Sequence, residues 1–257
     1  MERMTTKQAK KAWTCRQVMK ELKSMGSAQT IKTYRNHGIT GEMFGVSYAN
    51  LKALDKRVPN DQKLAEELWA TGNADARTFA CWKADENVMT AKDLDAWARD
   101  VDNPGTSFEL GALAAFTDHG AKLSRKWRKL KSESRRGMGW RMVGTLAMQP
   151  DRPESEGGIS DAELTECLAT IEATIHAEEN NVRQSMNTTL ICIGGRSSMM
   201  KKALATAKRV GEVYVDQGNT GCKTAVAYDK IKKVAEHYEA KGKKPTDGAG
   251  GKRRRHC

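Results

Sequence analysis

A dense basic stretch from Lys122 to Arg141 contains the residue types best suited to binding an anionic partner. Nine of its residues are basic and one, Glu133, is acidic, and two tryptophans, Trp127 and Trp140, lie among them. Cationic side chains on apolar anchors suit the phosphate backbone of a nucleic acid. A solvated helix surface is the alternative interpretation. The candidate phosphate contacts in this stretch are Arg125, Lys126, Arg128, Lys129, Arg135 and Arg136.

Two pairs of polar residues later in the chain are further candidates. Arg183 and Asn187 lie four positions apart, so they share one side of a predicted helix, and we expect that side to face the same partner. Lys201 and Lys202 begin another predicted helix, where positive charge opposes the helix dipole. That conflict favours a binding role, and an ordinary solvated helix end is again the alternative.

No metal or cofactor site is expected. His37, His119 and His176 end predicted helices, where the dipole favours a histidine without any metal. The six cysteines show neither a CxxC pair nor zinc spacing, which predicts a reducing cytosolic compartment. Cys222 lies in a glycine-rich loop with Asp216 and Asn219 but has no adjacent base to activate it.

The charge of the whole chain supports an anionic partner. The 257 residues include 44 Lys and Arg against 32 Asp and Glu, a net charge of +12. This excess predicts a polyanion as partner, with an acidic protein surface as the next choice. The first residues contain no apolar run long enough for a signal peptide or a membrane span, so no membrane contact is expected.

The elements that must position these residues are helices. The hydrophobic pattern predicts about a dozen amphipathic helices of roughly 10–16 residues with short joints, and no strand pattern. The basic stretch itself divides into two helices joined at Lys131 to Ser134. The predicted helix caps are Thr14, Ser47, Asp61, Asn73, Thr90, Thr106 or Ser107, Ser160, and Ser197 or Ser198.

The helices recur in pairs about every 30–45 residues, the spacing of an all-α solenoid of the HEAT or armadillo type. A compact helical bundle is the alternative. We expect residues 1–241 to form this helical repeat domain. Val213 to Val215 is predicted to be a very short strand or extended chain. Residues 242–257 are polar and basic and are predicted to form a disordered tail.

Five stretches, taken in order, have motifs in common with a known family. They are TYRNHGITGEMFGVSYANLKAL (Tyr34, Phe44 to Ser47, Leu51), ELWATGNADARTFACW (Leu68, Trp69, Asp75, Arg77), SRRGMGWRMVGTLA (Arg135, Arg136, Trp140), NNVRQSMNTTLICIG (Arg183, Met186, Leu190) and VYVDQGNTGCKTAVAYDKIKKV. Together they resemble the AlkD-type DNA alkylation repair family of HEAT-like repeat DNA glycosylases. The last stretch and the basic tail with its terminal cysteine resemble an uncharacterised branch of that family.

The resemblance implies helical repeats curved into a basic concave face that holds duplex DNA. It also implies excision of cationic N3- or N7-alkylated purines without base flipping, with a carboxylate that stabilises the sugar cation. The matching position for that carboxylate is Glu109, with Asp102 as second candidate, in a stretch that lacks the family's tryptophan. Arg136, or Arg135 with a one-residue shift, matches the family's backbone-positioning arginine.

Three functions follow as hypotheses. The first is a DNA-binding alkylation-repair protein that acts as a glycosylase on alkylated duplex DNA, as a monomer in the bacterial cytosol and without cofactor. The second is a non-catalytic repeat protein that recognises damaged or distorted DNA through its backbone. The third is a helical scaffold for an acidic protein partner.

Overall fold

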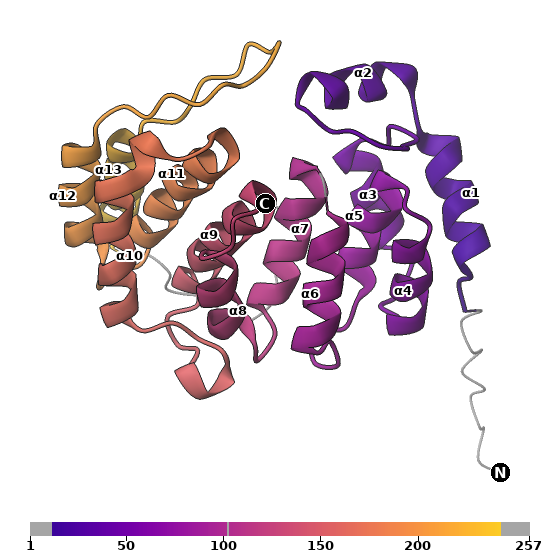
Figure 1. The fold of residues 1–257 in the computed structure, drawn as a ribbon, viewed down its shortest axis with the longest axis horizontal. Coiled ribbons are helices and arrows are strands. Elements are labelled where there is room, and N and C mark those ends of the chain that lie inside the picture. Colours follow the sequence, from indigo (N-terminus) through magenta and orange to yellow (C-terminus); the bar gives the residue numbers. More distant parts are fainter. Residues whose placement is uncertain (1–11, 102, 243–257) are drawn as a thin grey trace.

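The computed structural model describes residues 12–101 and 103–242, and in these residues it contains thirteen α-helices and no strand. Figure 1 shows the helices following one another along a curved array. The prediction of an all-α fold is confirmed. The helices are α1 (Cys15–Met25), α2 (Ala28–Asn36), α3 (Tyr48–Asp55), α4 (Gln62–Ala70), α5 (Ala74–Lys83), α6 (Ala91–Asp100), α7 (Pro104–Ala115), α8 (Gly120–Trp127), α9 (Glu133–Ala147), α10 (Asp161–Thr174), α11 (Asn180–Gly194), α12 (Met200–Val210) and α13 (Ala227–Ala240).

Local side chains start most helices where the sequence predicts. The side chains of Thr14, Ser47, Asp61, Asn73, Thr90 and Ser160 each accept a hydrogen bond from a backbone N–H of the first turn.

Two predicted starts are wrong. Helix α7 begins at Pro104 and not after Thr106 or Ser107, because Asn103 accepts from the Thr106 N–H at 3.0 Å and proline suits the first helical position. Helix α12 follows Met199 and has no side-chain cap, although Ser197 and Ser198 precede it.

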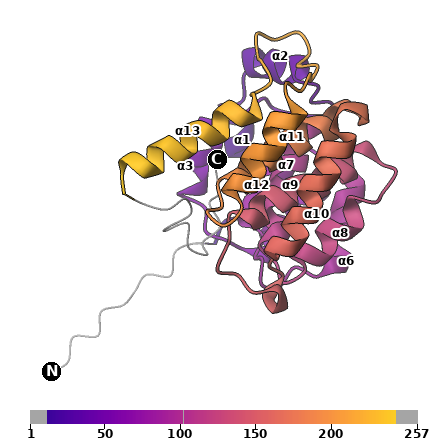
Figure 2. The ribbon, with the colours of Figure 1, turned by 90° about the vertical axis from the view of Figure 1, so that its left-hand side faces the viewer.

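The helices pack as two layers. Helices α5, α7, α9 and α11 contact one another in sequence, and α4, α8 and α10 each contact the inner helix that follows them in the chain. Figure 2 shows α6, α8 and α10 on one side and α7, α9 and α11 beside them. A chain of neighbour contacts of this kind is the packing of a helical solenoid, which confirms the predicted architecture over the compact bundle.

The basic stretch supplies core residues as well as charge. Trp127 of α8 is fully buried and Trp140 of α9 is almost fully buried, as predicted for its apolar anchors. The two helices approach closely at Gly139, where an added Cβ atom would lie 2.6 Å from the backbone nitrogen of Arg128. A joint separates the two helices as predicted, but it covers residues 128–132 and not Lys131 to Ser134, since α8 ends at Trp127 and α9 starts at Glu133.

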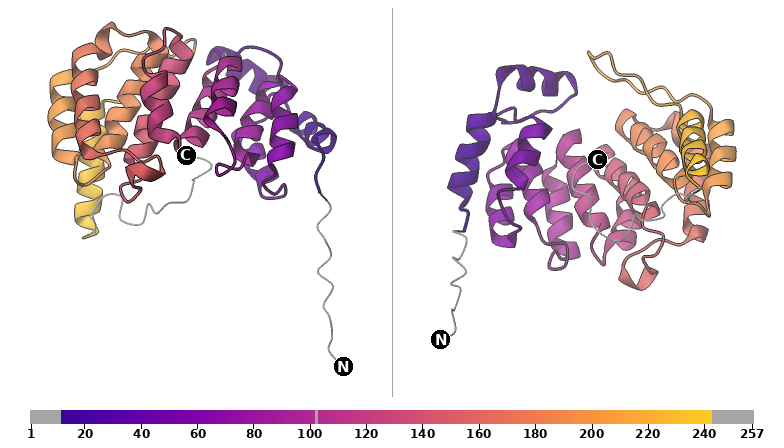
Figure 3. Two further views of the ribbon diagram at one scale, coloured as in Figure 1. Left: turned by 60° about the horizontal axis from the view of Figure 1, so that its bottom comes forward. Right: turned by 180° about the vertical axis from the view of Figure 1, so that it is seen from behind.

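Two segments stand apart from the layers and project from the same edge of the array. One is α2 with the loop after it, and the other is the non-helical segment 211–226 between α12 and α13 (Figure 3). Val213 and Val215 of that segment are buried and Tyr214 between them is 74% exposed, so the chain is extended here but does not pair as a strand.

Some predictions fall outside the described part of the chain. Asp102 lies there, as does the predicted tail apart from Gly242. In the described part, no helix combines the length and apolar character that a bilayer crossing requires.

Candidate nucleic-acid interface

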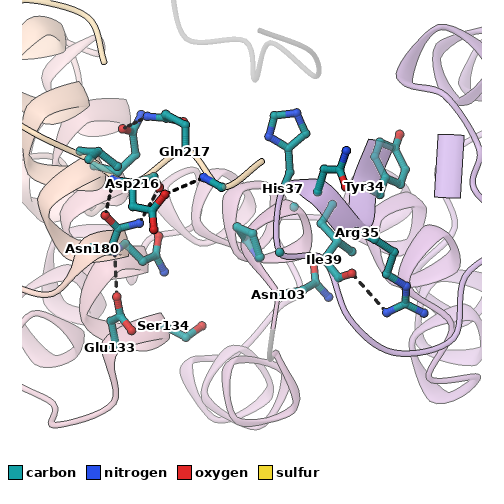
Figure 4. A pocket seen from close by; sticks show the side chains of 18 of the residues that line it. Tyr34, Arg35, His37, Ile39, Asn103, Glu133, Ser134, Asn180, Asp216 and Gln217 are labelled. Carbon is teal, nitrogen blue, oxygen red and sulfur yellow. Dashed lines mark hydrogen bonds between the residues drawn. The ribbon is translucent and has the colours of Figure 1, made fainter. Parts of the chain in front are cut away.

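A groove of about 760 Å³ opens where three neighbouring helices of one layer begin. One wall is formed by residues 34–39 at the end of α2, and the other by residues 215–218 (Figure 4). Between the walls lie the first residues of α7, α9 and α11. The groove residues used below are Tyr34, Arg35, His37, Tyr48, Asn103, Glu133, Ser134, Arg141, Asn180, Asn181, Gln184, Asp216, Gln217 and Gly218.

The three helix starts bring partial positive charge to this groove. A helix N-terminus carries a partial positive charge and unpaired N–H groups, and it is a natural site for a phosphate. No side-chain hydrogen bond caps α9 or α11, whereas Asn103 caps α7. Glu133 offsets part of this charge, because its Oε1 accepts from the Asn181 N–H at 2.7 Å.

Arg141 of α9 adds a full positive charge to the groove. Its guanidinium stacks 5.3 Å from the ring centre of Phe108, and its Nε is buried without a hydrogen-bond partner among the described residues. Burial lowers the pKa of Arg141, and nearby Tyr48 and Glu109 act in the opposite direction. An arginine stays protonated in proteins, so this guanidinium is a cation beside the groove.

Glu109 of α7 is placed behind the groove. The residue is 5% exposed, and Trp82 of α5 donates its indole N–H to Oε2 at 2.6 Å. Tyr48 also hydrogen-bonds to it, and burial, with Glu109 adding to it, raises the pKa of the Tyr48 hydroxyl. Tyr48 and Arg141 line the groove and Glu109 does not, so the carboxylate influences the groove through these neighbours.

The wall at Tyr34 is built from the first two stretches that resemble the family. The Asp75 carboxylate accepts from the backbone N–H groups of Phe44, Gly45 and Val46 at 2.7, 3.0 and 3.1 Å. Burial raises the pKa of Asp75 and these three hydrogen bonds oppose that rise. Tyr34 donates its hydroxyl to the Val46 carbonyl at 2.7 Å, which fixes its ring beside the groove.

The predicted contacts of α8 bind carboxylates of neighbouring helices instead of lining the groove. Arg125 and Arg128 both pair with Glu163 of α10, at 2.7 and 3.0 Å. Lys126 pairs with Asp95 of α6. Lys129 is exposed. These cations join the successive helices of one layer.

Arg135 and Arg136 have different environments. The Arg136 side chain is 16% exposed, pairs with Glu178 at 3.2 Å and with Glu179, and donates to the Leu130 and Lys131 carbonyls. Arg136 therefore ties α9 to the start of α11. Arg135 is partly exposed.

The polar side of α11 holds the segment that forms one wall. Arg183 donates to the Tyr214 carbonyl at 2.8 Å, and Asn187, which is 2% exposed, donates to the Ala225 carbonyl at 2.8 Å. Lys202 of α12 donates to Thr165 at 3.1 Å and Lys201 is exposed. Of the described residues that line the groove, none is one of the ten predicted DNA contacts.

Sequence reasoning missed the groove residues Tyr34, Tyr48, Arg141, Asn180 and Asn181. A partial signal was available, because Arg141 belongs to the basic stretch and Asn180 and Asn181 open a predicted helix. The starts of α7, α9 and α11 come together only because the solenoid packs these helices side by side, and the sequence pattern does not show that packing. Among the described residues, no group of three or more His, Cys, Asp or Glu side chains could hold a metal ion.

Comparison with known proteins agrees with the family resemblance of the sequence motifs. Residues 18–209 match the model of the family described as DNA alkylation repair enzyme. The chain is similar to the uncharacterized protein Lin0241 of Listeria innocua and to the uncharacterized protein Lmo0209 of Listeria monocytogenes. Each is 27% identical over 222 residues, covering 83% of this chain and 94% of the relative.

A solved structure has the same fold. It is described as a new family of proteins related to the HEAT-like repeat DNA glycosylases with affinity for branched DNA structures. The TM-score is 0.77 and the identity 26%, and the match covers 95% of this chain and 99% of that one.

Proposed function

Because the chain belongs to the DNA alkylation repair enzyme family, we propose that it binds branched or distorted DNA through the groove between residues 34–39 and 215–218. The observation that carries this proposal is the meeting of three helix N-termini with Arg141 in one groove. The affinity of the structurally similar protein for branched DNA supports it.

The groove suits a sugar-phosphate backbone better than a base edge. The uncapped start of α9 supplies backbone N–H donors, and Arg141 supplies positive charge. Such contacts position a strand without reading its sequence. A binding site of this kind selects DNA by shape, as a branch point requires.

Excision of alkylated purines from duplex DNA is the second candidate function. The family supports it, and so does a buried carboxylate, Glu109, directly behind the groove residue Tyr48. A cationic alkylpurine leaves as a neutral base, so a carboxylate that stabilises the sugar cation would suffice without a general acid. In this arrangement Glu109 has to give up contacts with Trp82 or Tyr48 to reach a sugar, so we rank excision second.

The test compares binding and chemistry on the same protein. Binding to a labelled three-way junction should be tighter than to a duplex of the same length, and should weaken steeply as salt rises. Release of free base from duplex DNA with N3- and N7-alkylpurines, measured for the wild type and Glu109→Gln, tests excision. Junction binding without base release supports the first function. Equal affinity for junction and duplex, or binding insensitive to salt, contradicts it.

We expect the protein to act as a monomer in the cytosol, where bacterial DNA is accessible. Sedimentation of the free protein and of its DNA complex would show a dimer if this expectation is wrong.

A further inference from the structure

The two walls of the groove meet at its mouth. A Cβ atom added to Gly218 would lie 2.5 Å from the carbonyl oxygen of Asn36, so the two backbones are in contact there. Gly218 has a φ of +65°, a conformation that other residues rarely adopt. Residues 34–39 and 215–218 thus approach each other from the two ends of the solenoid (Figure 1).

Both walls are held by side chains and not only by their own backbone. The Asn180 amide donates to the Asp216 carbonyl at 2.9 Å and accepts from the Asp216 N–H at 2.8 Å. On the other wall, Arg35 donates to the Ile39 and Gly41 carbonyls at 3.3 and 2.8 Å. Each wall is therefore held in place on its own side of the groove.

The size of the groove limits what can occupy it. Its volume of about 760 Å³ lies within the range of roughly 300–1,000 Å³ that holds a drug-sized ligand. An intact duplex is much larger, since its major groove alone is about 12 Å wide. A duplex therefore cannot lie between walls that touch, whereas about one or two unpaired nucleotides fit the volume.

The chemistry of the lining matches an unpaired strand. Tyr34, His37 and Tyr48 provide rings at the groove, and bases of any sequence stack on aromatic side chains. Arg141 and the start of α9 provide positive charge for the phosphates that connect the bases. Proteins that bind single strands combine these two features.

Two carboxylates also line the groove, and both are engaged. Glu133 accepts from the Asn181 N–H, and Asp216 Oδ1 accepts from the Gly218 N–H at 2.8 Å. These hydrogen bonds shape the walls, and the cations Arg35 and Arg141, which also line the groove, balance the two negative charges.

We propose that the groove holds a short unpaired segment of one strand at a DNA branch point, with the contact between Gly218 and Asn36 excluding the intact duplex. This inference rests on the proposed function and names the part of the branched DNA that enters the site. Duplex arms then contact the protein outside the groove.

The test uses two forks that differ in one arm. One fork carries a single-stranded arm, and in the other the same arm is paired with a complementary strand. The wild type should bind the first about tenfold more tightly, the size of effect expected from stacking one base. A 2-aminopurine at the first unpaired position should change its fluorescence when the protein binds.

Two glycine variants in the same loop provide a matched pair. Gly218→Ala places a Cβ atom against the Asn36 carbonyl and should separate the walls, so the preference for the single-stranded arm should fall below about twofold. Gly221→Ala adds a Cβ atom into open space and should keep the full preference. Thermal melting of both variants checks that each is folded.

The outcomes separate this inference from the proposed function. Equal, salt-sensitive binding of the two forks by the wild type leaves the proposed function intact and overturns the inference. Unchanged 2-aminopurine fluorescence in the bound fork also overturns it, and this result needs no variant. Absence of binding to either fork removes the proposed function and the inference together.

Discussion

The indole nitrogen of Trp82 lies 2.6 Å from Oε2 of Glu109, so the residue that the family resemblance assigns to catalysis is hydrogen-bonded within the core. Tyr48 bonds to the same carboxylate. Glu109 therefore holds the groove residue Tyr48 from behind, and its charge lies near Arg141. Whether it also acts on a substrate is a separate question that base release answers.

Replacing Glu109 with Gln should lower the free energy of unfolding by about 1–3 kcal/mol, because buried donors lose a charged acceptor. Affinity for branched DNA should fall as well, since Tyr48 loses the carboxylate that holds its hydroxyl beside the groove. Urea unfolding and junction binding measure the two effects. Glu166→Gln, at an exposed position on α10, is the control and should change neither. A fully stable Glu109→Gln variant would contradict the positioning role.

Arg136 and Arg135 should differ in their effect on stability. Arg136→Ala removes ion pairs with Glu178 and Glu179 and the hydrogen bonds to the Leu130 and Lys131 carbonyls, which should cost about 1–2 kcal/mol, since Glu179 is half exposed and solvent screens its charge. Arg135→Ala, next to it on the helix, should change stability by less than about 0.5 kcal/mol. Thermal unfolding compares them. Equal stability of the two variants would mean that the tie between α9 and α11 contributes little.

The pKa of Tyr34 predicts a loss of stability in alkaline solution. Burial, with Asp75 adding to it, raises the pKa of Tyr34 from 10.0 to about 12. The folded state therefore holds the neutral hydroxyl more tightly than the unfolded state does. The stabilisation is fully present below about pH 10 and is lost as the pH rises from about 10 to about 12.

Tyr34→Phe should flatten the decline in stability over this pH range, as urea unfolding at a series of pH values would show. At neutral pH the variant should be less stable by about 1 kcal/mol, because it lacks the hydrogen bond to the Val46 carbonyl. A tyrosinate absorbance titration should show one fewer late-titrating tyrosine in the variant. If the stability of the wild type and of Tyr34→Phe declined equally over this pH range, other titrating groups would cause the decline.

The sequence predicts the helices well because their signals are local. Thr14 and Thr90 cap helices whose first turns follow at once, and the period of the apolar residues is set within each helix. The start of α7 was misplaced because Asn103 and Pro104 compete with two later cap residues of similar quality. The solenoid itself follows from helices that each bury one face against the next pair.

The groove could not be predicted in the same way. Arg136 and Arg141 belong to one helix and one basic stretch, yet Arg136 binds Glu178 and Glu179 whereas Arg141 lines the groove. Which of them faces a ligand depends on the neighbouring helices and not on spacing. Arg183 and Asn187 share a polar helix side as predicted, but the structure uses that side to hold residues 214 and 225.

The most direct test of the account is the salt dependence of junction binding for Arg141→Gln beside Arg125→Gln. Both variants remove one arginine charge, but Arg141 lines the groove and Arg125 pairs with Glu163 on α10. Arg141→Gln should lower affinity about tenfold and reduce the slope of log affinity against log salt by about one. Arg125→Gln should leave both close to the wild type. The reverse pattern would place the DNA on the basic stretch of α8 and contradict the groove as its binding site.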